Sequence, residues 1–374
     1  MDLIKEKIEF GSQDSEAELN IAYGVDNNFL FGSGISMNSI IINNRNLKLK
    51  FHLFTDFIDD DFLLKFKSLA LNNNVSIDIY ILNSDELKKL PTSPVWSYAT
   101  YFRFFIFDYL CDTISSILYL DADVFCKGSL SHYTKIVFKD EFSAVIPDVP
   151  AMQESCESRL GIKNIKNKYF NAGVIFLNLK EWDSINFTKK AFELITHNHT
   201  GKPLKYLDQD ALNILFKCNN IYLSRDYNCI YTLKNELEKI NYRDYITDST
   251  KLIHYTGATK PWHYWAVDYP ASQTFKIAFD SSPWKAQSLV LAIKKPEYQE
   301  RYKHEFHQGK ILKGIGSLIK YRLIKWRWRL ANLFANLIVY LYLMSIGISS
   351  SSPLLNLLKW LFSIDSLSFP ENRV

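Results

Sequence analysis

Several patterns that mark familiar protein classes are missing from this sequence. Its few cysteines form no C-x-x-C pair and no His–Cys cluster with zinc spacing. They are Cys111, Cys126, Cys156, Cys218 and Cys229. The charged start Met1–Lys7 lacks the apolar core of a signal peptide, so no export is expected. These absences argue against a zinc module or disulfide framework and favour a reducing compartment with free thiols.

Two phosphate-binding signatures are also missing. Gly32 and Gly34 follow an apolar stretch but do not form G-x-G-x-x-G, so a dinucleotide fingerprint is not supported. No Walker-type loop occurs, which disfavours a metal-dependent phosphoryl-transfer enzyme of that kind.

Acidic residues are absent from Lys310 to Arg329, where seven Lys or Arg occur. The whole chain carries a net charge of only +4, so the rest of it nets about −3. The positive charge therefore belongs to one segment and implies a local acidic partner. Because that segment is also rich in apolar residues, a nucleic-acid role is not expected.

What is present indicates an α/β protein with a packed core. Of the 374 residues, 47% are hydrophobic and 22% are charged. Apolar stretches alternate with helical patterns in β-α-β-α-β order, which predicts a parallel sheet with helices on both faces. The first three predicted strands are 19–25, 50–55 and 75–82, with helices at about 35–43 and 59–71.

The stretch Ile117 to Val124 is the most informative. Its apolar run predicts a buried strand that ends in two carboxylates, Asp121 and Asp123. Ligands of open α/β sheets bind beyond the carboxyl ends of strands, where unshared acids are costly to keep ionised. Mg²⁺ or Mn²⁺ would bind such carboxylates together with substrate phosphates. The alternative is a solvated Asp-Ala-Asp turn.

Other polar side chains lie where strands end or helices begin, each with an ordinary structural alternative. Asp26 and Asn28 follow the first strand and suit a base or ribose, or a plain Asx turn. Arg103, in an otherwise apolar helix predicted over 97–110, needs an anion that is either a carboxylate or a ligand phosphate. Asn171 precedes a glycine that permits close backbone approach, or it is a turn residue.

Two more candidate sites occur later in the chain. Asp208 and Gln209 open a helix, where they contact a ligand or only cap the helix. His254 ends a short apolar strand and Lys260 follows it, which suits a metal ligand beside a phosphate-binding cation. The charged segment 151–168 is expected to be irregular and is a candidate lid.

Six of these stretches occur together and in order, and as a set they resemble family 8 of the retaining glycosyltransferases. They are Val25-Asp26-Asn27-Asn28, Tyr101-Phe102-Arg103, Leu118-Tyr119-Leu120-Asp121-Ala122-Asp123, Tyr169-Phe170-Asn171-Ala172-Gly173, Asp208-Gln209-Asp210 and His254 to His263. The resemblance spans about 20–285 and is strongest to bacterial lipopolysaccharide core α-1,2-glucosyltransferases.

The resemblance implies a GT-A (Rossmann-like) fold, with a mixed sheet flanked by helices and a helical C-terminal extension, and a set of roles. Asp121, Asp123 and His254 would bind Mn²⁺, with Mg²⁺ as an alternative. Asp26 and Asn28 would hold the uridine of a UDP-hexose, and Lys260 with Gly257 its diphosphate. Arg103, Asn171, Asp208 and Gln209 would surround the donor hexose, with Asp208, Gln209 and Lys260 as the catalytic residues.

The resemblance also implies a function, with alternatives. The expected reaction is transfer of a hexose, with glucose favoured over galactose, to the outer core of lipopolysaccharide through an α-1,2 linkage. A UDP-galactose-dependent α-1,3-galactosyltransferase is the nearest alternative, and a non-catalytic sugar-nucleotide-binding protein is one from another class. A front-face attack is favoured over a covalent intermediate on Asp208, since the chain shows no clear glycosidase-like carboxylate pair.

The tail from Ile311 has a helical pattern with an apolar face and cations opposite it. This pattern predicts a basic amphipathic helix that lies on a membrane surface. The resemblance implies that this surface is the cytoplasmic face of the inner membrane. The alternatives are a helix docked on the catalytic domain and, over the uncharged run 330–348, a membrane span.

The expected organisation of the whole chain is a polar leader (1–18), a catalytic domain (19–270) and a membrane-associating helical region (271–374).

Overall fold

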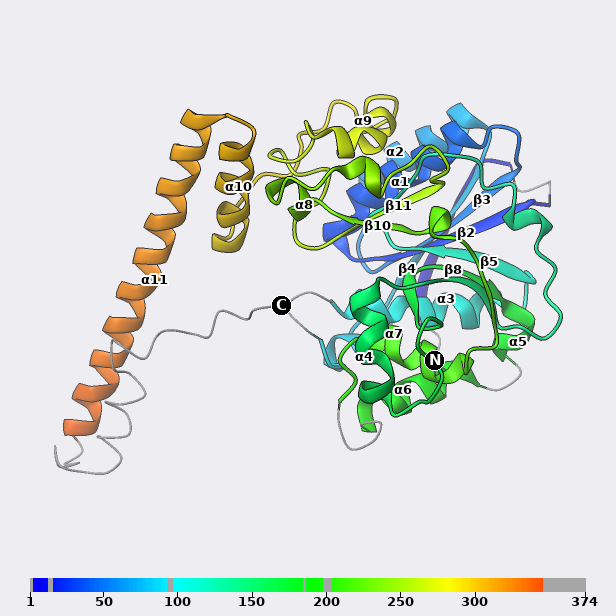
Figure 1. The fold of residues 1–374 in the computed structure, drawn as a ribbon, viewed down its shortest axis with the longest axis horizontal. Helices are drawn as coiled ribbons and strands as arrows, with labels where there is room; N and C mark the ends of the chain where they lie inside the picture. The colour runs from blue at the N-terminus through cyan, green and yellow to red at the C-terminus, as the bar shows by residue number, and fades with distance from the viewer. Residues whose placement is uncertain (1–2, 13–15, 93–96, 184–185, 198–202, 346–374) are drawn as a thin grey trace. The chain divides into compact units, whose positions relative to one another are not determined.

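A mixed sheet of eight strands is the framework of the N-terminal part of the molecule (Figure 1). The computed structural model describes the chain except residues 1–2, 13–15, 93–96, 184–185, 198–202 and 346–374. Across the sheet the strands are β1 (Ile4–Phe10), β4 (Ser76–Leu82), β3 (Leu49–Thr55), β2 (Leu19–Val25), β5 (Ser116–Leu120), β8 (Phe170–Asn178), β7 (Ser143–Pro147) and β9 (Asn220–Tyr222). The strands from β4 to β5 run parallel, whereas β8 is antiparallel to both its neighbours.

Helices cover both faces of this sheet, as two neighbouring residues of β2 show. Successive residues of a strand point to opposite faces, so Tyr23 and Gly24 contact different helices. Tyr23 shares a hydrogen bond with Ser36 of α1 (Leu30–Asn43), at 2.9 Å. At the next residue, Gly24, an added Cβ would lie 2.8 Å from Cβ of Phe102, the first residue of α3 (Phe102–Leu110). The predicted α/β class is therefore confirmed.

Helices α2 (Asp60–Asn73), α5 (Leu179–Asp183), α6 (Phe187–His197) and α7 (Leu207–Phe216) complete the two layers. Asp59 caps α2 by accepting a hydrogen bond from the Phe62 amide, and two acids in its first turn complement the helix dipole. The aromatic core beneath α3 contains Trp182, which stacks on Phe187 and packs against Phe107.

A second, three-stranded sheet supplies one wall of the candidate site. It consists of β10 (Cys229–Thr232), β11 (Leu252–Thr256) and β6 (Val124–Cys126), with β11 in the middle. Because β6 directly follows the Asp121–Asp123 turn, its antiparallel pairing with β11 sets His254 opposite Val124.

The segment 1–18, expected to be a polar leader, instead contains strand β1, which pairs antiparallel with β4. Its charges do not prevent this, because an edge strand leaves much of its surface in water and charges there block further pairing. Lys7 lies 3.4 Å from the buried Asp78 carboxylate.

The N-terminal unit extends to Leu291 rather than ending at 270. Helix α9 (Gln273–Asp280) packs on α1, where the Asn38 amide donates to the Ala278 carbonyl at 2.6 Å. Trp284 is fully buried against Phe66 and against Gly34, which leaves room for its ring. Residues 271–291 are therefore part of the N-terminal unit.

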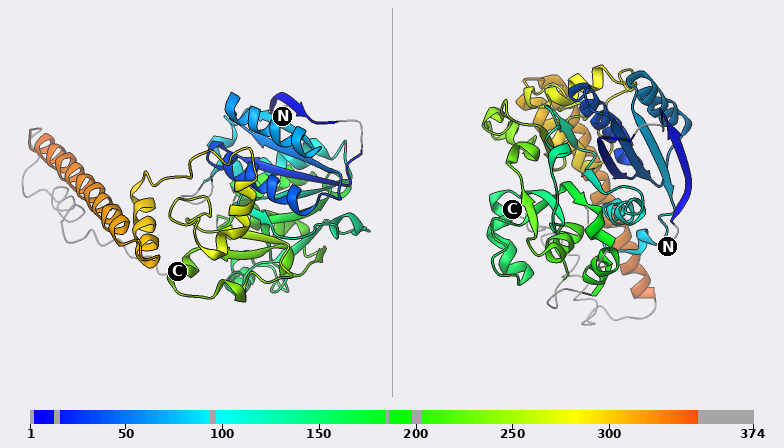
Figure 2. Two further views of the ribbon diagram at one scale, coloured as in Figure 1. Left: turned by 90° about the horizontal axis from the view of Figure 1, so that it is seen from above. Right: turned by 90° about the vertical axis from the view of Figure 1, so that its right-hand side faces the viewer.

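The second unit, Ala292–Val374, contains a pair of packed helices, α10 (Lys295–His307) and α11 (Ile311–Ser345) (Figures 1 and 2). Ser317 of α11 donates to the buried Glu305 carboxylate at 2.6 Å, and Gly314 fits against the Phe306 ring. Among the helices of the described residues, none is long and apolar enough to span a bilayer. Residues 346–348 of the uncharged run lie outside the described part.

The segment 151–168 is more regular than expected. It begins as helix α4 (Pro150–Leu160), with proline at the first turn and Gly161 in the left-handed conformation at its end. Arg159 of this helix forms an ion pair with Asp210.

Candidate active site

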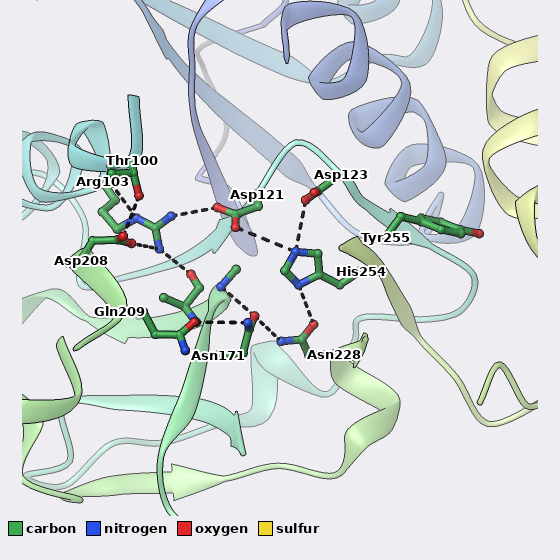
Figure 3. Close-up of polar contacts among 12 residues, drawn as sticks. Thr100, Arg103, Asp121, Asp123, Asn171, Asp208, Gln209, Asn228, His254 and Tyr255 are labelled. Carbon is green, nitrogen blue, oxygen red and sulfur yellow. Dashed lines mark hydrogen bonds and ion pairs between the residues drawn. The ribbon is translucent and has the colours of Figure 1, made fainter. Parts of the chain in front are cut away.

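Two carboxylates and an imidazole meet beyond the end of β5 (Figure 3). Asp121 and Asp123 occupy the turn between β5 and β6, and His254 comes from the middle of β11. His254 Nε2 lies 3.2 Å from Asp123 Oδ1 and 4.0 Å from Asp121 Oδ2. One potential ligand atom from each residue lies within 4.8 Å of the others.

The strand that passes beside this cluster is shaped to leave it space. At Gly173 of β8, an added Cβ would lie 2.3 Å from His254 Cε1 and 2.8 Å from Asp121 Oδ2. Oxygen ligands from two carboxylates, with one imidazole nitrogen, suit a divalent ion such as Mn²⁺ or Mg²⁺. These residues therefore fit a divalent metal centre.

Lys260 adds a cation to one side of the cluster. Its Nζ lies 2.5 Å from Asp123 Oδ2 and 2.8 Å from the Tyr255 carbonyl oxygen. Although burial alone would raise the pKa of Asp123, Lys260 and His254 hold it well below its ordinary value. Burial alone would lower the pKa of His254, but Asp123 and Asp121 outweigh burial and raise it. The cluster is therefore electrostatically coupled across three elements.

Arg103 joins this cluster to a third acid. Its guanidinium lies 2.9 Å from Asp121 Oδ1 and 3.0 Å from Asp208 Oδ2, and it also donates to the Ala172 carbonyl at 2.7 Å. Burial raises the pKa of Asp208, and Arg103 opposes this effect. The anion partners that the sequence required for Arg103 are thus two carboxylates of the site itself.

An amide network lies beside these ion pairs (Figure 3). Gln209 accepts from the Ala172 amide at 3.1 Å and donates to Asp148 at 2.8 Å. Asn171 donates to Gln209 at 3.3 Å. Burial raises the pKa of Asp148, against the hydrogen bonds from the Val149 amide and Gln209. A fourth carboxylate therefore borders the site in a partly dry environment.

The remaining predicted residues lie around this centre. The Asp26 carboxylate, just beyond β2, accepts hydrogen bonds from the backbone N–H of Asn28 at 3.0 Å and from the Ser97 hydroxyl at 2.8 Å. Gly257 follows β11 with a φ of +87° that favours glycine. Because β2 and β5 are parallel neighbours, Asp26 and Asp121 lie at the same edge of the sheet.

Sequence reasoning missed three polar residues of this site: Asp148, Asn228 and Thr100. Thr100 donates to Asp208 at 2.7 Å, and Asn228 contacts both His254 and Asn171. Asp148 directly follows the short apolar strand β7, as Asp121 follows β5, so its position at a strand end was a signal that could have identified it.

Known proteins resemble this chain along most of its length. The profile described as glycosyl transferase family 8 matches residues 20–266, and the family 8 C-terminal profile matches 269–325. A lipopolysaccharide 1,2-glucosyltransferase of Escherichia coli is 41% identical, over 83% of this chain and 93% of that protein. The corresponding protein of strain K12 is 45% identical, over 79% and 88%.

Two further likenesses extend the comparison. A lipopolysaccharide 1,3-galactosyltransferase of Salmonella typhimurium is 36% identical, over 86% of this chain and 96% of that protein. The crystal structure of the galactosyltransferase LgtC with donor and acceptor sugar analogues has a TM-score of 0.60 and 23% identity, over 76% of this chain and all of that one. The latter supports the GT-A-like fold alone. With both profiles matched and relatives above 40% identity, the chain belongs to glycosyltransferase family 8.

Proposed function

We propose that this protein is a retaining hexosyltransferase that moves glucose from UDP-glucose to the outer core of lipopolysaccharide, forming an α-1,2 linkage. The observation that carries the proposal is the convergence of Asp121, Asp123 and His254 with Lys260 on one side and Asp208 with Gln209 on the other. The names of the two relatives above 40% identity support glucose and the 1,2 linkage.

In this proposal each group has a chemical task. Mn²⁺, with Mg²⁺ as the alternative, would be held by Asp121, Asp123 and His254 and would supply positive charge to the diphosphate. Lys260 stabilises the charge that grows on departing UDP. Gly257 lies exposed at the end of β11, where its backbone can approach the same diphosphate. Asp26 and Asn28 bind the uridine end.

The sugar-binding side is formed by buried polar groups. Arg103 and Thr100 hold the Asp208 carboxylate in place, and Asn171 and Gln209 present amide groups next to it. Asp208 and Gln209 stabilise the oxocarbenium-like centre, and the leaving phosphate takes the proton of the acceptor during a front-face attack. A covalent intermediate on Asp208 is disfavoured, because its carboxylate already accepts from Thr100 and pairs with Arg103.

The test is a donor panel. UDP-glucose and UDP-galactose are compared on truncated lipopolysaccharide acceptors, and the product linkage is determined by NMR. A preference for UDP-galactose with a 1,3 product would favour the alternative that the Salmonella relative suggests. Absence of metal-dependent hydrolysis of either donor would favour a non-catalytic sugar-nucleotide-binding protein.

The proposed location is the cytoplasmic face of the inner membrane, with peripheral attachment. Helix α11 exposes a line of apolar side chains: Ile315 (44%), Ile319 (53%), Leu323 (54%) and Trp326 (59%). Their spacing of three or four residues keeps them on one side of the helix, and Lys313, Lys320 and Arg327 are exposed beside them. A basic amphipathic helix of this kind suits an anionic membrane surface.

A further inference from the structure

Asn228 connects the candidate metal ligand to the sugar-binding amides. It lies just before β10 and its side chain is buried, with 1% of the residue exposed. Its Oδ1 is 3.2 Å from His254 Nδ1, and its Nδ2 donates to Asn171 Oδ1 at 3.0 Å (Figure 3). A single side chain therefore touches both halves of the site.

The backbone of β8 fixes which way these amides point. The Gly173 N–H donates to Asn171 Oδ1 at 3.0 Å, so that atom must be the carbonyl oxygen and not the amide nitrogen. The Ala172 N–H donates in the same way to Gln209 Oε1. Since Asn171 offers an acceptor to Asn228, the group of Asn228 that faces it must be the NH2 donor.

This orientation determines the state of His254. With its NH2 turned toward Asn171, Asn228 presents its carbonyl oxygen to His254 Nδ1, which must therefore carry a proton. In the neutral ring the lone pair then lies on Nε2, the nitrogen that faces Asp121 and Asp123. The backbone N–H of Gly173 thus fixes the orientation of the Asn171 amide, which in turn fixes the orientation of the Asn228 amide. The Asn228 oxygen then keeps the proton of a neutral His254 on Nδ1, away from the metal-facing nitrogen.

We propose that Asn228 is a positioning residue that holds His254 in the Nδ1–H tautomer and couples it to Asn171. The inference rests on the proposed function for the roles of His254 and Asn171. It gives Asn228 two separable tasks, because its oxygen serves His254 and its nitrogen serves Asn171. Partners of this kind typically change metal affinity or activity by about 10- to 100-fold when they are removed.

Two variants separate these tasks from a merely structural role. Asn228→Leu removes both contacts at similar volume, so binding of Mn²⁺ with UDP should weaken by about 10- to 100-fold. Asn228→Asp keeps an oxygen for His254 but faces Asn171 Oδ1 with a second acceptor. It should therefore bind Mn²⁺ with UDP as the wild type does, while kcat falls roughly tenfold. A structural role would lower both quantities in parallel with thermal stability.

The tautomer of His254 can also be measured directly in the wild-type protein, with one variant used only to assign the signals. With ¹⁵N-labelled histidine and diamagnetic Mg²⁺ with UDP, the ring nitrogens of His254 are assigned by their absence in His254→Gln. We expect a protonated Nδ1 both with and without Mg²⁺ and UDP. A neutral His254 protonated on Nε2, wild-type binding in Asn228→Leu, or wild-type kcat in Asn228→Asp would each overturn the inference. The NMR result does not depend on which sugar or acceptor is used, so failure of the donor panel remains distinguishable from failure of this inference.

Discussion

Gly173 and His254 are in such close contact that a methyl group on the glycine would lie 2.3 Å from the imidazole Cε1. Since β8 is hydrogen-bonded to β5 and β7, neither neighbour allows the backbone to move aside easily. In Gly173→Ala we expect His254 to be displaced and binding of Mn²⁺ with UDP to fall roughly 100-fold. The free energy of unfolding should drop by about 1–3 kcal/mol, the usual effect of overpacking.

Calorimetry with Mn²⁺ and UDP, together with urea unfolding, measures both effects. The matched control is Gly316→Ala in α11, where an added Cβ meets no other atom within 4 Å. Normal Mn²⁺ and UDP affinity in Gly173→Ala would show that the site tolerates movement of His254.

The carboxylates give the second prediction. Asp121→Asn and Asp123→Asn each remove a charged ligand, so turnover should fall to background while the protein stays folded. Chelator should abolish wild-type activity and Mn²⁺ should restore it. Activity assays with circular dichroism as the folding control test this, and full turnover in chelator would exclude a metal role.

Arg103 gives the third prediction because its charge is shared by two acids. In Arg103→Met, Asp121 and Asp208 lose their common cation, and the free energy of unfolding should drop by about 3–5 kcal/mol. Arg103→Lys should also destabilise the protein, because an ammonium cannot reproduce the guanidinium fork that spans both carboxylates. Adding Asp208→Asn to Arg103→Met should recover part of the loss. Chemical denaturation of the three variants measures this coupling, and equal stability of the single and double variants would contradict it.

His52 gives a prediction for pH dependence. It lies buried in β3 between Tyr80 and Asn20, and burial lowers its pKa to about 3, against the opposing effect of Asp78. An unfolded histidine titrates near 6.5, so below that pH the unfolded state binds an extra proton. Stability should therefore be intact above about pH 6.5 and fall toward pH 3, by up to about 1.4 kcal/mol per pH unit from this group.

The matched variant is His52→Gln, which keeps a polar side chain but cannot titrate. Urea unfolding at pH 7, 6 and 5 should give a shallower decline for this variant than for the wild type. Parallel declines would mean that His52 is not protonated on unfolding in this range.

The strand-end carboxylates show what the sequence could predict. An apolar run that stops at Asp121 and Asp123 indicates a ligand edge, and a short strand ending near His254 suits the same edge. Their closeness in space follows from the pairing of β6 with β11, which no local pattern specifies. The family resemblance supplied this connection, and the family and the fold class are confirmed.

Other features depended on tertiary context. Asn228 follows the short turn Arg225–Tyr227 and looks like an ordinary loop residue until β10 brings it next to His254. Strand β1 is so polar that only its pairing with β4 reveals it. The unit boundary at 291 depends on Trp284, whose burial against Gly34 could not be inferred from residues near it in the sequence.

The last prediction concerns the exposed apolar line of α11, formed by Ile315, Ile319, Leu323 and Trp326. Truncation before Ile311 would also remove Ser317 from the buried Glu305, so point variants give a sharper test. Replacing all four residues of the line with Gln should strongly weaken sedimentation with anionic lipid vesicles. Only the attraction of the cations to the anionic surface, about 1 kcal/mol for each nearby cation, would then remain.

UDP-glucose hydrolysis should be unchanged in this variant, whereas transfer to membrane-embedded acceptor should fall far more than transfer to a soluble oligosaccharide, since membrane attachment raises the effective concentration of acceptor. The matched control is Leu64→Gln with Leu71→Gln on α2, two exposed leucines of the catalytic unit. High salt should release the wild type only partly, because salt screens the cations but not the apolar contacts. Undiminished vesicle binding by the fourfold variant would exclude α11 as the membrane-binding element.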